Sequence, residues 1–218
     1  MSAIRVYHFL SAEHALDDIE KRRIKISEID QLNDPFELWC VAQENKDLRD
    51  RLRDYKKTMN KRFGMLCFCK GWSNPLLWSH YADKHRGVCL GFDVEDNTVL
   101  PVRYVRDRPS IPYPFTEDLQ TVSDRLLWTK YIDWRYEEEL RSWISLIERD
   151  PTTQLYFCDF RENLQLKETI AGPLCEVTEQ RMQEALGDMK DVAVIKARLA
   201  FKTFRVVATG WRFDTEST

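Results

Sequence analysis

The stretch YIDWRYEEELRSWI, residues 131–144, concentrates charged side chains between aromatic and β-branched ones. Aromatic and β-branched flanks predict a β-strand. Side chains alternate along a strand, so Glu137, Glu139 and Arg141 would share one face. That face is either the solvated side of an edge strand or a row of charges that lines a cleft. On a helix, Glu137 and Arg141 would instead form an exposed i,i+4 pair.

Other elements are expected on both sides of this stretch. Apolar runs predict strands at 4–9, 24–27, 65–69, 88–92, 102–105, 155–160, 166–171 and 202–209. Capping residues and apolar spacing predict helices at 11–21, 45–62, 75–87, 117–130 and 178–199. Strands that follow one another near the C-terminus, but are separated by helices near the N-terminus, indicate an α+β fold. We expect a single domain over residues 1–218, with a split mixed or antiparallel sheet and flanking helices.

Two details of packing follow from these elements. The strand at 102–105 is expected to pair with the strand at 88–92. On the helix that begins at Pro75, the side chains of Leu76, Leu77 and Tyr81 are expected to face the core.

The composition suits a folded domain with reduced cysteines. Hydrophobic residues make up 43% of the chain, and its seven glycines form no phosphate-binding loop. The net charge of −3 gives no overall attraction to nucleic acid, and the locally basic segment 56–62 is expected to be a solvated helix face. Cys67 and Cys89 lie in apolar runs without zinc-ligand spacing, which predicts buried thiols and no metal. We expect no signal peptide, no membrane span and a cytoplasmic location.

Three short motifs carry polar side chains that a ligand would need. Tyr7-His8 ends the first strand, where His8 either caps the sheet or donates a hydrogen bond at the mouth of a cleft. Residues 33–37, NDPFE, form a turn held by an Asx hydrogen bond, and their polar groups are also candidates for ligand contact. Tyr81 lies among aromatic and histidine side chains that are either core residues or a stacking platform.

Together these motifs resemble a known family. The order YHF, LNDPFE, LLWSHYADKHRGVCLGFD and WRYEEELR, from Tyr7 to about Gly172, is similar to the DUF2971 family of bacterial proteins. The family name declares unknown function, so this resemblance implies no activity.

A second resemblance is to the ADP-ribosyltransferase superfamily, in its His-Tyr-Glu branch. It implies an ADP-ribosyltransferase-like fold and NAD as the substrate, with a role as a toxin or phage-defence effector. By this resemblance His8 contacts the NAD ribose, Tyr81 stacks on nicotinamide, and Glu139 or Glu137 is the catalytic carboxylate. Tyr81 departs from the pattern because it is expected on a helix, where the superfamily has strand-borne aromatics.

Further ligand contacts complete the predicted site. Arg141 is expected to hold the pyrophosphate through its planar guanidinium, and Tyr7 and Asn33 to contact the cofactor. The macromolecular acceptor is nucleic acid or protein, and an antitoxin or inhibitor protein is a possible partner. Two other functions stay open. One is a metal-dependent nuclease, with Asp34, Glu37, Glu137 and Glu139 as ligands, and the other is a non-catalytic ligand-sensing module.

Overall fold

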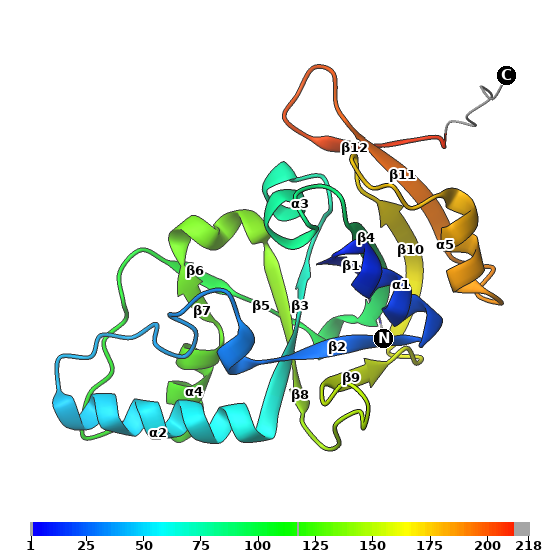
Figure 1. Cartoon of the computed structure of the whole chain (residues 1–218). Helices are drawn as coiled ribbons and strands as arrows, with labels where there is room; N and C mark the ends of the chain where they lie inside the picture. Colours follow the sequence, from blue (N-terminus) through cyan, green and yellow to red (C-terminus); the bar gives the residue numbers. More distant parts are fainter. Residues whose placement is uncertain (1, 117, 212–218) are drawn as a thin grey trace, which may run out of the picture. The chain divides into compact units, whose positions relative to one another are not determined.

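The chain divides into two compact units in the computed structural model, which describes residues 2–116 and 118–211 (Figure 1). Unit 1 comprises Met1–Ile24, Phe68–Asp96 and Asp159–Thr218. Unit 2 comprises Lys25–Cys67 and Asn97–Cys158. The expected α+β class is confirmed, while the single domain over residues 1–218 stays a prediction.

Unit 1 is built on a mixed sheet. Its strands are β1 (Ala3–Leu10), β4 (Val88–Glu95), β10 (Leu164–Ala171), β11 (Ala193–Leu199) and β12 (Val206–Thr209). They lie in the order β12-β11-β10-β4-β1, in which only β10 and β11 run parallel. In the register of β1 and β4, Tyr7 lies opposite Gly91 and His8 lies opposite Leu90.

The helices of unit 1 begin at residues with capping side chains. They are α1 (Ala12–Glu20), α3 (Pro75–Tyr81) and α5 (Glu179–Leu186). Ser11, Asn74 and Thr178 precede them, and each side chain accepts a hydrogen bond from a backbone N–H in the first turn of its helix. The predicted starts of these three helices are therefore confirmed.

Trp78 on α3 is fully buried in the core of unit 1. Its indole nitrogen donates a hydrogen bond to the carbonyl of Trp72 at 2.6 Å, and its ring meets that of Phe9 edge to face, with centroids 5.1 Å apart. An indole buried with its N–H satisfied loses no hydrogen bond on folding.

Unit 2 contains short strands and two longer helices. Its helices are α2 (Lys46–Arg62), α4 (Leu119–Leu127), η1 (Ile29–Gln31) and η3 (Ile132–Glu137), the last two being three-ten helices. Its strands are β5 (Leu100–Pro101), β6 (Arg103–Val105), β7 (Thr129–Tyr131) and β8 (Glu139–Ser145). Strand β8 pairs with β5 and with β3 (Phe63–Cys69), and β6 pairs in parallel with β7. The chain passes from one unit to the other within β2 (Arg23–Glu28), β3 (Phe63–Cys69), η2 (Asp96–Thr98) and β9 (Tyr156–Asp159).

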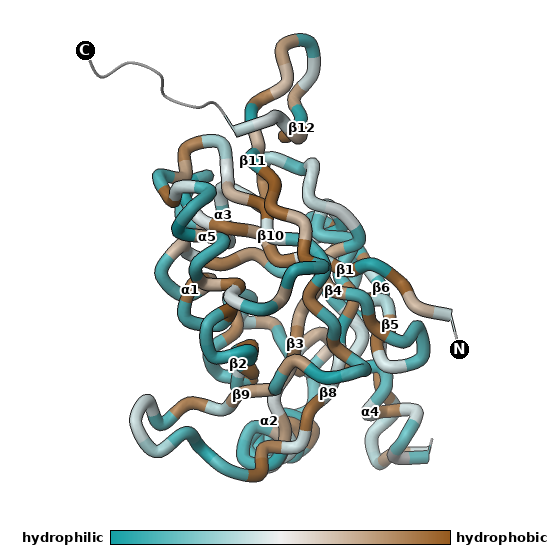
Figure 2. Tube along the Cα trace, turned by 90° about the vertical axis from the view of Figure 1, so that its right-hand side faces the viewer, coloured by the Kyte–Doolittle hydropathy of each residue, from teal (hydrophilic) through white to brown (hydrophobic). Residues whose placement is uncertain are grey.

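Helix α2 exposes most of its surface, and Figure 2 shows it largely hydrophilic. Only Leu48 and Leu52 on this helix are buried, against a small apolar cluster to which Val41, Val122 and Leu126 belong. The prediction that segment 56–62 is a helix face is confirmed.

Several predicted elements have different bounds or partners, and the strand expected at 202–209 begins only at Val206. The helix expected over 178–199 ends at Leu186, because Gly187 adopts a φ of +58° and the β-branched residues that follow favour strand β11. The strand at 102–105 pairs with β7 rather than with residues 88–92. The helix expected over 117–130 ends at Leu127, and its predicted start at Glu117 lies outside the described residues.

The helix that begins at Pro75 ends at Tyr81, well before the expected end at Gly87. Residues 83–85 all have positive φ and cannot continue an α-helix. Leu76, expected in the core, is 46% exposed, whereas Leu77 is 1% exposed. Tyr81 is half-buried at the last position of the helix.

The six cysteines all lie in the described part of the chain and form no disulfide, and those of β3 and β4 lie on strands as expected. Cys89 is fully buried and Cys67 is half-buried. Among the described residues, no helix has both the length and the apolar character needed to cross a bilayer.

The neighbours Leu76 and Leu77 test this placement of α3. Leu77→Ala is expected to lower the free energy of unfolding by about 2–5 kcal/mol, because it removes buried methyl groups and leaves a cavity. Leu76→Ala should change it by less than about 1 kcal/mol, since much of that side chain already contacts water. Urea denaturation of both variants measures the difference, and equal losses would contradict the packing of α3.

Candidate functional site

The turn between η3 and β8 brings two carboxylates to one place in unit 2. Glu137 is the last residue of η3 and Glu139 is the first residue of β8. Glu138 between them has a left-handed φ of 45° and is exposed, while the side chains of Glu137 and Glu139 are 3% and 4% exposed. The prediction that Glu137 lies on the strand is wrong, because this single left-handed residue separates it from β8. Glu139 and Arg141 lie on the strand as expected.

Arg141 is buried between two carboxylates, with 1% of its surface exposed. Its Nη1 and Nη2 donate to Oε2 and Oε1 of Glu37 at 2.9 and 2.5 Å. Its Nε donates to Oε1 of Glu139 at 2.7 Å, and Nη1 also donates to the carbonyl oxygen of Leu127 at 2.9 Å. This fork-to-fork geometry is the strong form of an arginine–carboxylate pair. Glu139 and Arg141 therefore do not lie on a solvated face of the strand, which was one of the two interpretations of this stretch.

Lys130, at the middle of β7, supplies the second buried cation. Its Nζ lies 2.7 Å from Oε2 of Glu137, 3.1 Å from Oε2 of Glu139 and 3.8 Å from Oε1 of Glu37. The same ammonium lies 4.8 Å from the centre of the Trp134 ring. Three carboxylates thus surround one ammonium group, which an aromatic ring also contacts.

The buried charge cluster consists of three carboxylates and two cations, which are Glu37, Glu137, Glu139, Lys130 and Arg141. When every group is ionised, the cluster carries a net charge of −1. Burial alone would raise the pKa of Glu139, but the charges of Arg141 and Lys130 outweigh it and lower this pKa to about 2. Burial raises the pKa of Glu37 above its ordinary value, against the opposing charge of Arg141. Repulsion from Glu139 adds to the effect of burial on this pKa, while the charge of Lys130 opposes it.

The carboxylates expected to bind metal in a nuclease do converge in part. Glu37, Glu137 and Glu139 lie together, but the position between them is taken by the ammonium of Lys130. Asp34 accepts a hydrogen bond from the backbone N–H of Phe36 at 2.9 Å, which confirms the predicted Asx turn. Across residues 2–116 and 118–211, no group of three or more histidine, cysteine or acidic side chains has the arrangement to hold a metal ion.

Two further polar side chains contact the cluster. The hydroxyl of Tyr104 accepts a hydrogen bond from the backbone N–H of Glu139 at 2.8 Å. Burial and the charge of Glu139 raise the pKa of the Cys67 thiol well above its ordinary value. Cys67 is therefore held as a neutral thiol, not as a reactive thiolate.

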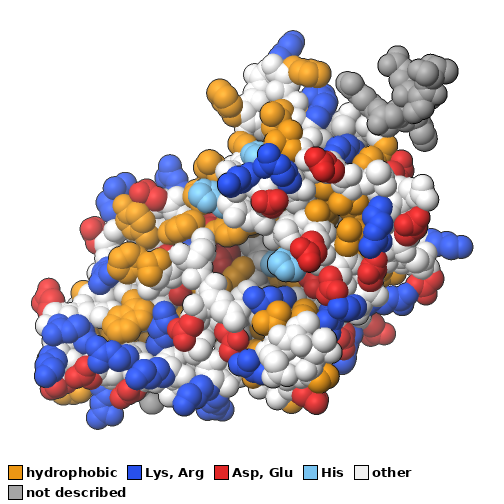
Figure 3. Space-filling model, viewed as in Figure 1, with side chains coloured by type: hydrophobic (Ala, Val, Ile, Leu, Met, Phe, Trp, Pro, Cys, Tyr) orange, Lys and Arg blue, Asp and Glu red, His pale blue; other side chains and the backbone are white. Residues whose placement is uncertain are grey.

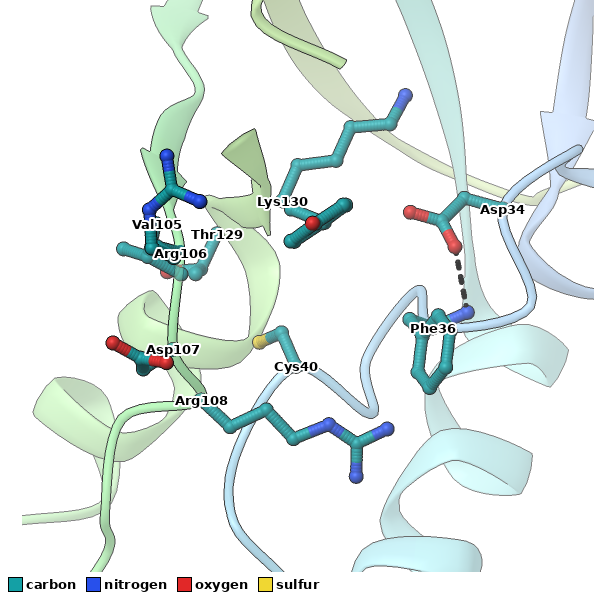
Figure 4. Close-up of a pocket in the computed structure, with 10 residues that line it drawn as sticks. Asp34, Phe36, Cys40, Val105, Arg106, Asp107, Arg108, Thr129 and Lys130 are labelled. Atoms are coloured by element: carbon teal, nitrogen blue, oxygen red, sulfur yellow. Dashed lines mark hydrogen bonds between the residues drawn. The ribbon is translucent and has the colours of Figure 1, made fainter. Parts of the chain in front are cut away.

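A pocket of about 310 Å³ lies beside this cluster and shares Lys130 with it. Its lining consists of Asp34, Phe36, Cys40, Val105, Arg106, Asp107, Arg108, Thr129, Lys130 and Tyr131. Figure 4 shows Asp34 and Phe36 on one side of the pocket and Val105, Arg106 and Thr129 on the other. All of these residues belong to unit 2.

The polar groups of the pocket suit a ligand with hydroxyl and phosphate groups. Thr129 is 2% exposed, and its hydroxyl has no hydrogen-bond partner among the described residues. Asp34 is 3% exposed and offers a carboxylate oxygen beyond the one bound to Phe36. The guanidinium of Arg108 lies 4.6 Å from the centre of the Phe36 ring, which places a cation and an aromatic surface together. Burial raises the pKa of Cys40 to about 11, so its thiol stays protonated.

The other predicted cofactor residues lie in different places. Tyr7 and His8 are neighbours on β1 and point to opposite faces of the sheet in unit 1. Burial and the nearby Glu168 raise the pKa of Tyr7 to about 12, while the ring of His8 lies 6.0 Å from that of Phe68. The structure therefore does not bring Tyr7 and His8 together.

Asn33 and Tyr81 were the other two residues expected to contact the cofactor. Asn33 is exposed in the turn before Asp34, and Tyr81 lies in unit 1 at the end of α3. Of the seven predicted site residues, the structure thus brings together Glu137, Glu139 and Arg141.

The sequence-based prediction missed Lys130, Thr129 and Arg108. The helix predicted over 117–130 includes Lys130, whereas the structure places this residue on β7. Arg108 stands in a proline-rich segment where the sequence predicts neither a helix nor a strand. No local pattern distinguishes Thr129, which lies opposite Arg103 on β6.

Residues 77–142 match the model of a family described as "Protein of unknown function (DUF2971)". This stretch includes the motif around Tyr81 and the motif WRYEEELR, so the first resemblance is confirmed over these residues. No curated protein and no solved structure matches the chain. The resemblance to ADP-ribosyltransferases stays a prediction.

The low pKa of Glu139 predicts how stability changes in acid. A carboxyl group whose pKa is lower in the folded than in the unfolded chain stabilises the fold above its unfolded pKa, and this contribution is lost as the pH falls. For Glu139 the loss should occur between about 4.5 and about 2. We expect Glu139→Gln to remove up to about 3 kcal/mol of the acid-dependent change in unfolding free energy, since one pKa unit corresponds to about 1.4 kcal/mol.

Glu138→Gln is the matched control, because its exposed side chain should leave the acid dependence almost unchanged. Urea denaturation at a series of pH values measures both variants. Identical acid profiles for Glu139→Gln and the wild type would show that Glu139 is not held between cations.

Proposed function

We propose that the chain is an NAD-dependent enzyme of the ADP-ribosyltransferase type, which binds a nucleotide portion of its substrate in the pocket of unit 2. The observation that carries this proposal is the buried hydroxyl of Thr129, which lacks a partner among the described residues and lines a pocket that also contains cations. A buried polar group without a partner is costly, and a bound ligand would relieve that cost.

The fit of a nucleotide rests on three features of the lining. The carboxylate of Asp34 is suited to accept hydrogen bonds from ribose hydroxyls. The guanidinium groups of Arg106 and Arg108 suit phosphate oxygens, and the rings of Phe36 and Tyr131 suit a planar base. A volume of about 310 Å³ is at the lower end for small-molecule sites, so the pocket suits part of a dinucleotide rather than all of it.

In this proposal, the residues of the pocket bind the substrate and the charge cluster stabilises the transition state. When bound, NAD supplies the ADP-ribosyl group and a nicotinamide leaving group. Asp34 and Arg108 would bind and orient it. The excess negative charge of the cluster would favour positive charge that develops nearby, because charges act over longer distances where water is excluded.

The buried geometry refines the role expected for Glu139. Its oxygens are held by Arg141 and Lys130, so it acts through its charge in this arrangement and not by direct contact. Glu137 is bound to Lys130, and it could act as a base toward the acceptor only after release from that ammonium. A toxin or phage-defence role, and an antitoxin or inhibitor partner, stay predictions.

Ligand sensing without catalysis is the competing function, because the same pocket features serve it equally. The metal-dependent nuclease is less well supported, since Lys130 stands where its metal would lie. Release of nicotinamide from NAD separates the enzyme from the sensor, which would bind NAD and leave it intact.

The binding step is tested with Thr129→Val. Valine keeps the shape but removes a hydroxyl that has no partner in the described structure, so the free energy of unfolding should stay the same or rise. Affinity for NAD should fall by roughly 2- to 13-fold, the equivalent of one hydrogen bond of about 0.5–1.5 kcal/mol. Calorimetric titration measures the affinity.

Arg108→Ala should also weaken NAD binding, while Arg103→Ala, exposed on β6 and absent from the lining, is its control. Wild-type affinity in both Thr129→Val and Arg108→Ala would reject this pocket as the site. A wild-type protein that neither binds nor consumes NAD would reject the enzyme class.

The catalytic step is tested with Glu139→Gln. Removing its charge should lower nicotinamide release at saturating NAD by about 100-fold or more, the effect of about 3 kcal/mol of lost transition-state stabilisation. Affinity for NAD should change little, because the ground state gains little from that charge. Glu138→Gln, with its exposed side chain, should release nicotinamide at the wild-type rate. Equal rates for Glu139→Gln and the wild type would exclude an electrostatic role for Glu139.

A further inference from the structure

The β11–β12 hairpin of unit 1 has a charge composition unlike the rest of the chain. Residues 192–211 contain no acidic side chain, and their basic residues are Lys196, Arg198, Lys202 and Arg205. The whole chain carries a net charge of −3. This hairpin is therefore a local cationic surface on an acidic protein, which overall net charge does not reveal.

Two phenylalanines stand out of the loop that joins the strands. Phe201 is 88% exposed and Phe204 is 98% exposed. Figure 3 shows hydrophobic and basic side chains gathered where this hairpin lies. Such rings bury almost nothing in the protein, so they contribute little to the stability of the fold.

Backbone contacts hold the loop in shape. The N–H of Ala200 donates to the carbonyl of Arg205 at 2.9 Å, and the N–H of Arg205 donates to the carbonyl of Thr203 at 2.9 Å. The guanidinium of Arg198 lies 4.3 Å from the centre of the Phe201 ring. At the base of the hairpin, the ammonium of Lys196 lies 5.6 Å from the centre of the Trp211 ring. Cations and aromatic rings thus alternate along one small element.

We propose that this hairpin binds single-stranded nucleic acid, with bases stacked on Phe201 and Phe204 and phosphates near Lys202 and Arg205. Proteins that bind single strands combine aromatic stacking surfaces with cations that follow the backbone. Interpreting this strand as the acceptor of ADP-ribose rests on the function proposed above. Binding itself requires no NAD, so the two proposals can fail separately.

Charge and geometry favour this occupant over two others. A second copy of the hairpin would bring like charges together, which opposes self-association through Phe201 and Phe204. Insertion of Phe201 into a bilayer would draw the guanidinium of Arg198, which lies over its ring, toward the hydrocarbon. A nucleic acid can bind both kinds of side chain, because a base can stack on a phenylalanine ring while a phosphate pairs with a nearby cation.

Fluorescence anisotropy with labelled oligothymidylate and single-stranded RNA tests the inference, in the absence of NAD and at several salt concentrations. The double variant Phe201→Ser, Phe204→Ser should weaken binding by about 30-fold or more, with little change in salt dependence. The double variant Lys202→Ala, Arg205→Ala should weaken binding and reduce the slope of log K against log salt by about 1.4, since each contact with a single strand contributes about 0.7.

A matched control on α2 removes two other exposed lysines. Lys57→Ala, Lys61→Ala removes the same formal charge and should leave affinity within about threefold of the wild type. Failure of the wild type to bind either strand, or wild-type affinity in the phenylalanine variant, would overturn the proposal. So would equal affinity for duplex DNA, phenylalanine-dependent binding to phosphatidylserine vesicles in place of oligonucleotides, or dimerisation that the phenylalanine variant abolishes.

Discussion

The buried guanidinium of Arg141 is the constraint on which the structure of unit 2 depends. A cation removed from water must find acceptors for its donors, or its burial is very unfavourable. Here the acceptors come from Glu37, Glu139 and the carbonyl of Leu127. Glu37 lies 104 residues away in the sequence, so satisfying one side chain fixes the NDPFE turn against β8.

Lys130 extends this constraint from the cluster to the pocket. Its ammonium is held by Glu137 and Glu139, while the residue also lines the pocket next to Thr129. By binding Lys130, the carboxylates of Glu137 and Glu139 also hold β7 in place, and β7 forms part of the pocket wall. Replacing such a network by apolar residues can leave stability unchanged. The network instead fixes position and charge at the pocket, which is the role proposed for it.

Local sequence patterns predicted much of the secondary structure but little of the site. Ser11, Asn74 and Thr178 cap their helices as expected, because capping depends on residues close in sequence. The position of Glu139 and Arg141 on one strand also follows from local alternation. Burial of that strand face did not follow, because it depends on partners that are distant in the chain.

The predictions that the structure contradicts also have specific physical causes. One left-handed residue, Glu138, removed Glu137 from the strand, and no composition rule requires a glutamate to take that conformation. At the other end of the chain, Gly187 ended a helix whose continuation looked plausible from spacing alone. The pocket could not be predicted, since its lining comes from segments 34–40, 105–108 and 129–131.

An NMR titration tests most directly whether the pocket of unit 2 is the proposed NAD-binding site. With isotope-labelled protein, addition of NAD should move the backbone amide signals of Phe36, Arg108 and Thr129 most, with a common saturation curve. Amides of the outer strand β12 should move little. No saturable shift at Phe36, Arg108 and Thr129, or the largest shifts confined to residues of unit 1, would contradict the account.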